Sequence, residues 1–146
     1  MQQDDRTFVY VIEIATTPEK LWAGLISNEF WGKFSGPIES DWKTGSPVKF
    51  FSADGNLYSE GKILESRPPH TLSHTWPEPK GERTPDKPPL LTWTISPGSP
   101  GKVKLTLVHD HLSEKSFQGV SSGWPTLIAN LRNSLEPGRV PQIQEK

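Results

Sequence analysis

The sequence contains no cysteine among its 146 residues, so disulfide bonds, thiolate nucleophiles and zinc–thiolate sites are excluded. It also lacks an excess of charge of one sign, because 16 basic and 17 acidic side chains leave a net charge of −1. Such a balance does not indicate binding to nucleic acid or to an anionic membrane surface. We therefore expect no nucleic-acid partner.

Long apolar runs are missing as well. The amino-terminal sequence MQQDDRTF is polar and acidic, unlike a signal peptide, and the longest apolar run near it is FVYVI. A run of this length is far too short to cross a bilayer as a helix. We expect a cytoplasmic protein with no membrane insertion.

Motifs of common enzyme classes are also absent. No serine lies in a G-x-S-x-G motif, no histidine has an evident serine partner, and no glycine-rich phosphate loop occurs. Glu60, Glu65 and Asp41 fit solvated strand or turn carboxylates better than a catalytic pair. We therefore expect no cofactor, assign no catalytic residue, and favour a binding protein over an enzyme.

Aromatic residues are the feature that is present in excess. Hydrophobic residues make up only 32% of the chain, yet it contains six tryptophans and six phenylalanines. Rings must therefore supply much of the apolar volume. Two interpretations follow: a small core filled with large rings, or a wall of rigid aromatic surface around a cavity.

The amino-terminal part predicts a strand followed by helices. Residues 7–14 are rich in β-branched and aromatic types, and one face of this strand would carry Phe8, Tyr10, Ile12 and Ile14. Thr17 is placed to cap a helix that starts at Pro18, and Thr16 with Glu19 is an alternative capping box. The apolar stripe of this helix would be Leu21, Trp22, Leu25 and Ile26. A second short helix would follow, carrying Phe30, Trp31 and Phe34.

Residues 38–111 predict strands and turns. Asp54-Gly55 indicates a hairpin, Pro68-Pro69 ends its second strand, and residues 77–89 form a long, proline-rich, solvated connection. Alternation then places three sets of side chains on inward faces. These are Leu72, His74 and Trp76; Leu91, Trp93 and Ile95; and Val103, Leu105, Leu107, His109 and His111.

The last element is helical. Its stripe is Trp124, Leu127, Ile128, Leu131 and Leu135, with Pro125 in the first turn and Pro137-Gly138 at the end. We expect one domain over residues 1–137 and a polar, frayed tail over 138–146. One amphipathic helix must then cover a curved sheet, and the curvature leaves a gap between the two layers.

These elements and several short motifs resemble the helix-grip fold of the START-like superfamily. Within it, the sequence is similar to small single-domain proteins related to the activator of Hsp90 ATPase. The resemblance is carried by A-T-T-P-E-K-L-W (15–22), E-F-W (29–31), G-K-I-L-E-S-R-P-P-H-T-L-S-H-T-W (61–76), L-T-L-V-H (105–109) and G-W-P-T-L-I-A-N-L (123–131). It implies an α+β fold with a curved antiparallel sheet of about six to seven strands wrapped around a long carboxyl-terminal helix, and two short helices after the first strand.

The resemblance also implies a function. Relatives commonly bind lipids, polyketides or other apolar small molecules in a pocket between sheet and last helix, and a minority are cyclases, dehydratases or hydrolases. Eukaryotic relatives are Hsp90 co-chaperones. We expect an apolar small-molecule ligand, with a cavity-histidine enzyme and a chaperone-interacting module as alternatives. Exposed strand edges make a homodimer a further expectation.

The histidines leave three interpretations open. His109 and His111 lie two strand positions apart, about 6.6 Å, so they could bind one metal ion with His74 on a neighbouring strand as third ligand. They could instead be polar groups, hydrogen-bonded at the end of an apolar face. Third, His74 or His109 could orient a ligand's carbonyl or hydroxyl, or act as acid or base. We favour no metal, because Asp110 alternates away from both histidines.

The candidate ligand-binding residues combine these histidines with the aromatic and apolar side chains expected to face the gap. They are Trp22, Trp31, Phe34, Phe50, His74, Trp76, Trp93, Leu107, His109, Trp124 and Ile128.

Overall fold

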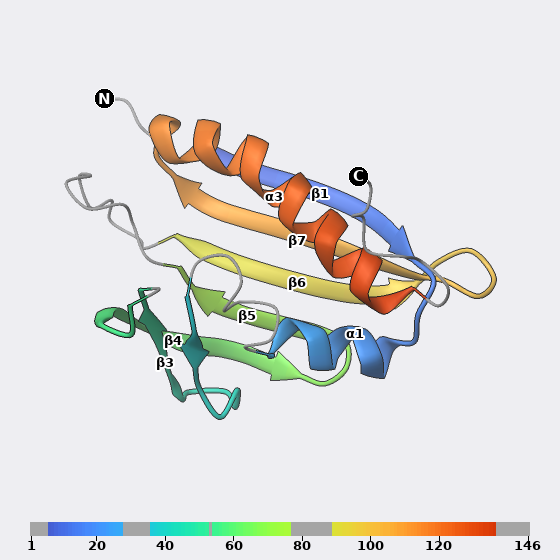
Figure 1. Cartoon of the computed structure of the whole chain (residues 1–146), viewed down its shortest axis with the longest axis horizontal. Helices are drawn as coiled ribbons and strands as arrows, with labels where there is room; N and C mark the ends of the chain where they lie inside the picture. Colours follow the sequence, from blue (N-terminus) through green and yellow to red (C-terminus); the bar gives the residue numbers. More distant parts are fainter. Residues whose placement is uncertain (1–5, 28–35, 53, 77–88, 137–146) are drawn as a thin grey trace.

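The computed structural model describes residues 6–27, 36–52, 54–76 and 89–136. Seven antiparallel strands form one sheet in the order β1-β7-β6-β5-β4-β3-β2. Its members are β1 (Arg6–Ile14), β2 (Ile38–Glu39), β3 (Pro47–Phe51), β4 (Leu57–Arg67), β5 (Thr71–Thr75), β6 (Leu90–Pro97) and β7 (Val103–Leu112). Helices α1 (Pro18–Leu25) and α3 (Glu114–Leu135) lie on the same face of this sheet (Figure 1). The predicted helix-grip fold and its strand number are confirmed.

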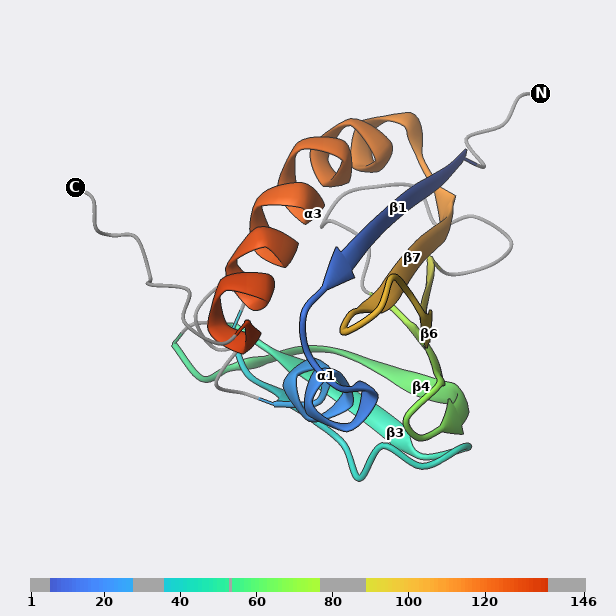
Figure 2. The same cartoon turned by 90° about the vertical axis from the view of Figure 1, so that its right-hand side faces the viewer.

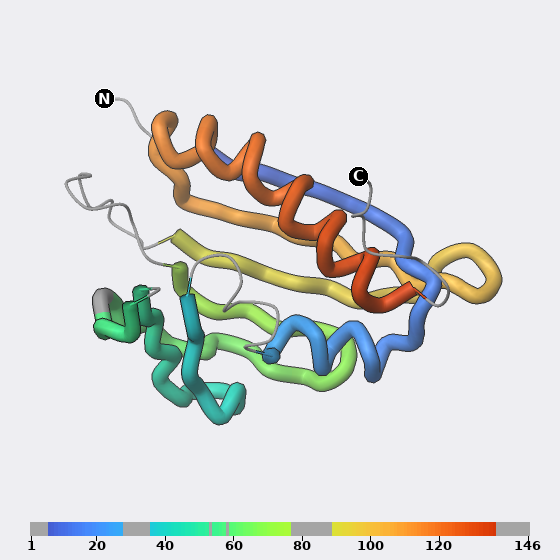
Figure 3. The backbone as a smooth tube through the Cα atoms, in the orientation of Figure 1, coloured from blue at the N-terminus to red at the C-terminus, as the bar shows by residue number. Residues whose placement is uncertain are grey.

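The sheet is strongly curved. In Figure 2 it runs from β1 round to β4 and β3, with α3 on the concave side. Register shifts occur in the β3–β4 pair, between Phe50 and Phe51, and in the β4–β5 pair, between Ile63 and Glu65. Such irregularities bend a strand and increase its twist, so the long strand β4 can pair with β5 along one part and with β3 along another. Figure 3 follows the backbone from β3 through the hairpin into β4.

The predicted faces of the strands are largely confirmed. On β1, Phe8, Tyr10 and Ile12 pack against the core and Ile14 is fully buried, whereas Val9 and Val11 on the opposite face are exposed. Strands β6 and β7 alternate in the same way, as a sheet covered on one side requires.

Helix α1 begins as its capping residues predict. Thr17 has an extended backbone, and its hydroxyl accepts a hydrogen bond from the backbone N–H of Lys20 at 3.2 Å. Leu21, Trp22 and Leu25 are buried, while Ile26 is half-buried. The second short helix, with Phe30, Trp31 and Phe34, lies outside the described residues, as do the tail 138–146 and most of the connection 77–89.

The start of helix α3 differs from the prediction. Its amino-terminal cap is Ser113, whose hydroxyl accepts from the backbone N–H of Ser116 at 3.1 Å, so Pro125 lies inside the helix and not in its first turn. A proline there removes one backbone hydrogen bond, and Figure 2 shows α3 as an arc over the sheet. Trp124, Ile128 and Leu131 form its buried stripe. No helix in the described part of the chain combines the length and hydrophobicity needed to cross a bilayer.

Candidate ligand-binding site

Two histidines lie in one row across the covered face of the sheet. His74 on β5 is paired with Leu91 on β6, and Leu91 is paired with His109 on β7. Their exposed fractions are 1% for His74 and 0% for His109. A strand thus separates the two histidines, so the prediction that His74 lies on the strand adjacent to His109 is wrong. The sheet nevertheless places both side chains on the same face.

Aromatic rings surround the two imidazoles. The ring centroid of Trp76 lies 6.3 Å from that of His74 and 6.1 Å from that of His109, and that of Trp124 lies 5.9 Å from His109. Trp124 also contacts Trp76 at 5.4 Å and Trp93 at 5.6 Å. We call this group the histidine–tryptophan cluster, and its members are Trp42, Phe50, His74, Trp76, Trp93, His109 and Trp124.

Burial keeps both histidines neutral. It lowers the pKa of His74 to about 4, although a hydrogen bond to the carbonyl of Thr75 acts in the opposite direction. Burial also lowers the pKa of His109 to about 3, and the charge that His74 would carry lowers it further. The free energy needed to desolvate a charged imidazole exceeds the stabilisation that these few contacts provide, so neither ring is protonated at neutral pH.

The hydrogen bonds assign a different tautomer to each ring. The indole Nε1 of Trp124 can only donate, and it lies 3.1 Å from Nδ1 of His109, so this Nδ1 is the acceptor and the proton is on Nε2. The carbonyl oxygen of Thr75 can only accept, and it lies 3.0 Å from Nδ1 of His74, so this Nδ1 carries the proton and Nε2 does not.

The Nε2 atom of each imidazole has no hydrogen-bond partner among the described residues. Among the residues that the structure describes, neither Nε2 of His74 nor Nε2 of His109 makes a hydrogen bond, although both atoms are buried. Buried polar atoms are normally satisfied because an unmet hydrogen bond costs about 1–3 kcal/mol. The cluster therefore presents one N–H donor, on His109, and one nitrogen acceptor, on His74.

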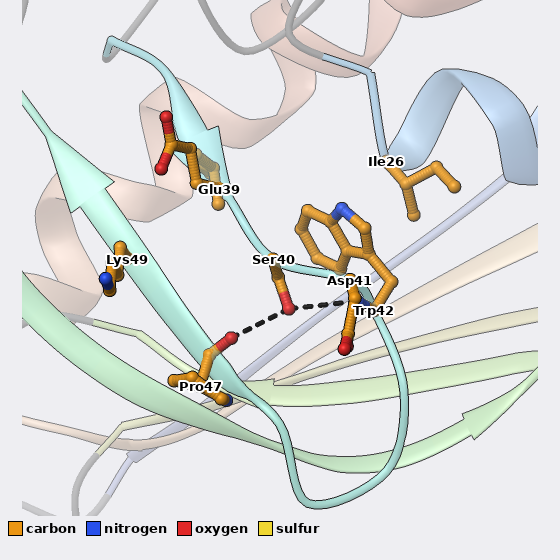
Figure 4. Close-up of a pocket in the computed structure, with 8 residues that line it drawn as sticks. Ile26, Glu39, Ser40, Asp41, Trp42, Pro47 and Lys49 are labelled. Carbon is orange, nitrogen blue, oxygen red and sulfur yellow. Dashed lines mark hydrogen bonds between the residues drawn. The ribbon is translucent and has the colours of Figure 1, made fainter.

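A cavity of about 540 Å³ opens beside this cluster (Figure 4). We call it the side cavity, and its described lining residues are Ile26, Ile38, Glu39, Ser40, Asp41, Trp42, Pro47 and Lys49. Figure 4 shows the side chain of Ile26 near the indole ring of Trp42. The hydroxyl of Ser46 and the backbone N–H of Lys43 hold the pKa of Asp41 below its usual value, which keeps this carboxylate charged.

Trp42 belongs to both the cavity and the cluster. Its ring lines the side cavity and lies 5.9 Å from the ring of His74, edge to face. Its φ is 60°, a left-handed conformation that is costly for a bulky residue. Two serines hold it there, because Ser40 Oγ accepts from the Trp42 N–H at 3.0 Å and Ser66 Oγ donates to the Trp42 carbonyl at 2.6 Å.

The structure brings most of the predicted site residues together. Phe50, His74, Trp76, Trp93, His109 and Trp124 all lie in the cluster, while Leu107 pairs with Trp93 across the strands and Ile128 is fully buried one turn after Trp124. Trp22 is buried on α1 but makes no ring contact with the cluster among the described residues. Trp31 and Phe34 lie outside the described residues. None of these predicted residues is among the described lining of the side cavity.

The predicted inward position of His111 is wrong. His111 has a φ of 63°, the β1–β7 register shifts between Arg6 and Phe8, and Leu112 is the buried residue at this end of β7. The imidazole near His109 is therefore that of His74. Within the described ranges, no group of three His, Cys, Asp or Glu side chains could hold a metal ion. Asp110 points away, as expected, and accepts a hydrogen bond from Thr7 Oγ1 at 2.7 Å.

Trp42 is the functional candidate that sequence reasoning missed. It lies in the polar loop S-D-W-K-T-G, where alternation gives no inward or outward assignment. A large aromatic side chain isolated among polar loop residues is the available signal, because such a loop offers no core of its own to bury the ring.

Comparisons with known proteins agree with this fold. A family model described as activator of Hsp90 ATPase homolog 1-like protein matches residues 15–136. A crystal structure from Mesorhizobium loti is 23% identical, covers 87% of this chain and 94% of that chain, and has a TM-score of 0.73. The Aha1 dimer from Colwellia psychrerythraea is 17% identical, with 92% and 99% coverage and a TM-score of 0.72. An Hsp90 activator from Plasmodium falciparum is 19% identical, with 86% and 92% coverage and a TM-score of 0.66.

These three likenesses are all below 25% identity and show a shared fold. No curated protein matches the chain.

Proposed function

Because this chain belongs to the activator of Hsp90 ATPase homolog 1-like family, which it matches over residues 15–136, we propose that it binds an apolar small molecule at the histidine–tryptophan cluster and the side cavity beside it. The observation that carries this proposal is the pair of unpartnered Nε2 atoms, on His74 and His109, inside an aromatic cluster. Ligand sites typically combine apolar walls with a few polar groups that fix orientation. The histidine–tryptophan cluster has this composition.

The side cavity supplies room for the rest of the ligand. A volume of about 540 Å³ lies within the range of small-molecule sites. Ile26, Ile38 and Trp42 provide apolar contact there, and the ring of Trp42 also contacts the ring of His74. We propose that the apolar body of the ligand occupies this cavity and that its polar end reaches the histidines.

The low pKa values favour binding over acid–base catalysis. A general acid or base works best when its pKa is near the working pH. With pKa values of about 4 and about 3, His74 and His109 are uncharged and weakly basic at neutral pH. They can orient a ligand by hydrogen bonds, but neither is suited to deliver a proton in a cyclase or hydrolase reaction.

Tryptophan fluorescence tests the proposed binding. Fatty acids, sterols and aromatic polyketide-like compounds would be titrated while the emission of the six tryptophans is followed. We expect a saturable change with at least one compound, and a smaller change in Trp76→Phe, since this ring lies between the histidines and Phe50. Trp22→Phe is the matched control, because Trp22 lies outside the cluster. A panel without saturable change in fluorescence or melting temperature would refute the proposal.

A chaperone-binding role is the second candidate. Val9 and Val11 are 55% and 51% exposed on β1, which is an edge strand of the sheet, and apolar residues there suit a protein partner. The same edge could pair with a second copy of the chain. Pull-down with an Hsp90-type chaperone, using Val9→Lys/Val11→Lys as control, and light scattering for the dimer would each give a clear answer. An absence of complexes at high concentration would exclude both.

A further inference from the structure

We propose that the site selects a hydroxyl group, so that the preferred ligand is a hydrophobic alcohol or phenol and not the corresponding ketone. This inference depends on the proposed binding function and specifies the ligand class of the same site. It is carried by the hydrogen-bonding state of two buried atoms, Nε2 of His109 and Nε2 of His74.

The two atoms need partners of opposite kind. The bond from Trp124 leaves His109 with a free N–H donor at Nε2, and the bond to the Thr75 carbonyl leaves His74 with a free nitrogen acceptor at Nε2. A ligand group that only accepts would satisfy His109 and leave His74 unmet. A group that only donates would do the reverse.

A hydroxyl is the smallest uncharged group that does both. Its oxygen accepts from His109 while its proton is donated to His74. Carbonyl and ether oxygens only accept, and a protonated amine only donates while bringing a charge into a buried site. A carboxylate accepts at both oxygens and is likewise charged. The cluster therefore matches an alcohol or a phenol.

The two histidines lie in one row on the covered face of the sheet, and we propose that one ligand group lies between them. They flank Leu91 in a single row across three strands, so their Cα atoms are about 9.6 Å apart at the usual strand spacing. Each imidazole extends from the same buried face, and the ring of Trp76 lies against both. The charge that His74 would carry lowers the pKa of His109, so the two imidazoles are near enough for their charges to interact.

Burial makes the selection strong. In a site without competing solvent, an unpaired polar atom is not compensated, so a ligand that lacks one hydrogen bond is rejected more strongly than it would be at a surface. Water, like an alcohol, can both donate and accept a hydrogen bond, so it can occupy the same position. The selectivity must therefore be measured between ligands that share one skeleton and displace the same water.

Isothermal titration calorimetry with three matched compounds tests the inference. The compounds are 1-tetralol, 1-tetralone and tetralin, which have one carbon skeleton and carry a hydroxyl, a carbonyl or no oxygen. We expect 1-tetralol to bind at least about tenfold more tightly than 1-tetralone, as one additional buried hydrogen bond implies. We expect tetralin to bind most weakly.

Two variants separate the acceptor from the donor. His74→Phe removes the acceptor, so 1-tetralol and 1-tetralone should then bind equally well. His109→Phe removes the donor, so 1-tetralone should fall to the affinity of tetralin while 1-tetralol keeps an advantage. His70→Phe is the matched control at an exposed histidine and should leave all three affinities unchanged. The affinity for tetralin reports whether each variant keeps an intact site.

The outcomes distinguish this inference from the function it depends on. Equal affinities of 1-tetralol and 1-tetralone for the unmodified protein, with tetralin also bound, would overturn the hydroxyl selection and leave apolar binding in place. A preference for 1-tetralol that persists undiminished in His74→Phe would overturn it as well. If none of the three compounds binds and the fluorescence panel is also silent, both proposals fall.

Discussion

The histidine–tryptophan cluster and the side cavity differ in what they offer a ligand. The cluster consists of contacting rings and holds two buried Nε2 atoms that have no hydrogen-bond partner among the described residues. The cavity has a volume of about 540 Å³ and is lined partly by Glu39, Asp41 and Lys49. Trp42 is common to both. Under the proposed function, the cluster would fix the orientation of a ligand by hydrogen bonds, and the side cavity would hold its apolar body.

The largest expected effect is the pH dependence of stability that the two buried histidines of the cluster produce. His74 and His109 have pKa values of about 4 and about 3 when folded, against 6.5 for an ordinary histidine, so between these limits the unfolded chain binds more protons. Above pH 6.5 both histidines are neutral in the folded and in the unfolded chain, so their burial does not make the free energy of unfolding depend on pH. As the pH falls from 6.5 toward 4, the unfolded chain gains protons that the folded chain does not, and the free energy of unfolding decreases. The slope approaches about 1.4 kcal/mol per pH unit for each histidine.

Urea denaturation at a series of pH values measures this slope. His74→Phe should reduce the slope by about half, and His70→Phe, at an exposed histidine, is the control variant. Hydrogen bonds lower the pKa values of Asp41 and Asp54 from the usual 3.8, so these carboxylates affect the free energy of unfolding only at lower pH. A flat profile between pH 6.5 and 4.5 would mean that the histidines are not buried as neutral groups.

Truncation of Trp124 should be the next largest effect. This side chain is only 4% exposed and contacts Trp76, Trp93 and His109. Trp124→Ala should lower the free energy of unfolding by about 3–5 kcal/mol, as for other buried aromatic residues. Ile26→Ala at the half-buried edge of the side cavity should cost less, and Thr126→Ala on the exposed face of α3 should stay within about 0.5 kcal/mol. Equal losses for Trp124 and Ile26 would contradict the contrast between a packed and an open region.

Gly61 on β4 lies so close to Thr75 on β5 that the chain has no room for a larger side chain there. A Cβ atom added at Gly61 would clash with the Oγ1 of Thr75, on the strand that carries His74. Gly61→Ala should lower the free energy of unfolding by about 1–3 kcal/mol through overpacking. The double variant Gly61→Ala/Thr75→Ala should lose less than the sum of the single variants in chemical denaturation, because the alanine at position 75 removes the atom that clashes. Simple additivity would show that the two strands separate freely here.

The smallest effect concerns the backbone of Trp42, with its φ of 60°. Glycine normally destabilises a protein relative to alanine, but at a left-handed position it relieves a strain of about 1–2 kcal/mol. Trp42→Gly should therefore be more stable than Trp42→Ala by about 1 kcal/mol, measured by thermal unfolding. At Trp76, which lacks a positive φ, the order should reverse. The same order at both positions would show that Trp42 is not strained.

Much of the fold follows from local sequence patterns, whereas the site depends on long-range pairing. Alternation correctly places Leu91, Trp93 and Leu107 on the covered face. The start of α3 escapes such patterns, because serines and glycines before Trp124 are weak helix formers and Pro125 is typical of a first turn. The partnership of His74 with His109 depends on strand order, and the turning of His111 depends on one backbone angle. Neither feature has a local signature in the sequence.

The central claim is that two neutral histidines of opposite tautomer lie buried in the cluster. Long-range proton–nitrogen NMR correlations of the imidazole rings at pH 7 test it most directly, with the four histidines assigned by single substitutions. We predict that His109 carries its proton on Nε2, that His74 carries its proton on Nδ1, and that both stay neutral as the pH is lowered to 5. The same tautomer on both rings, or protonation of either ring near pH 6.5, would contradict this claim.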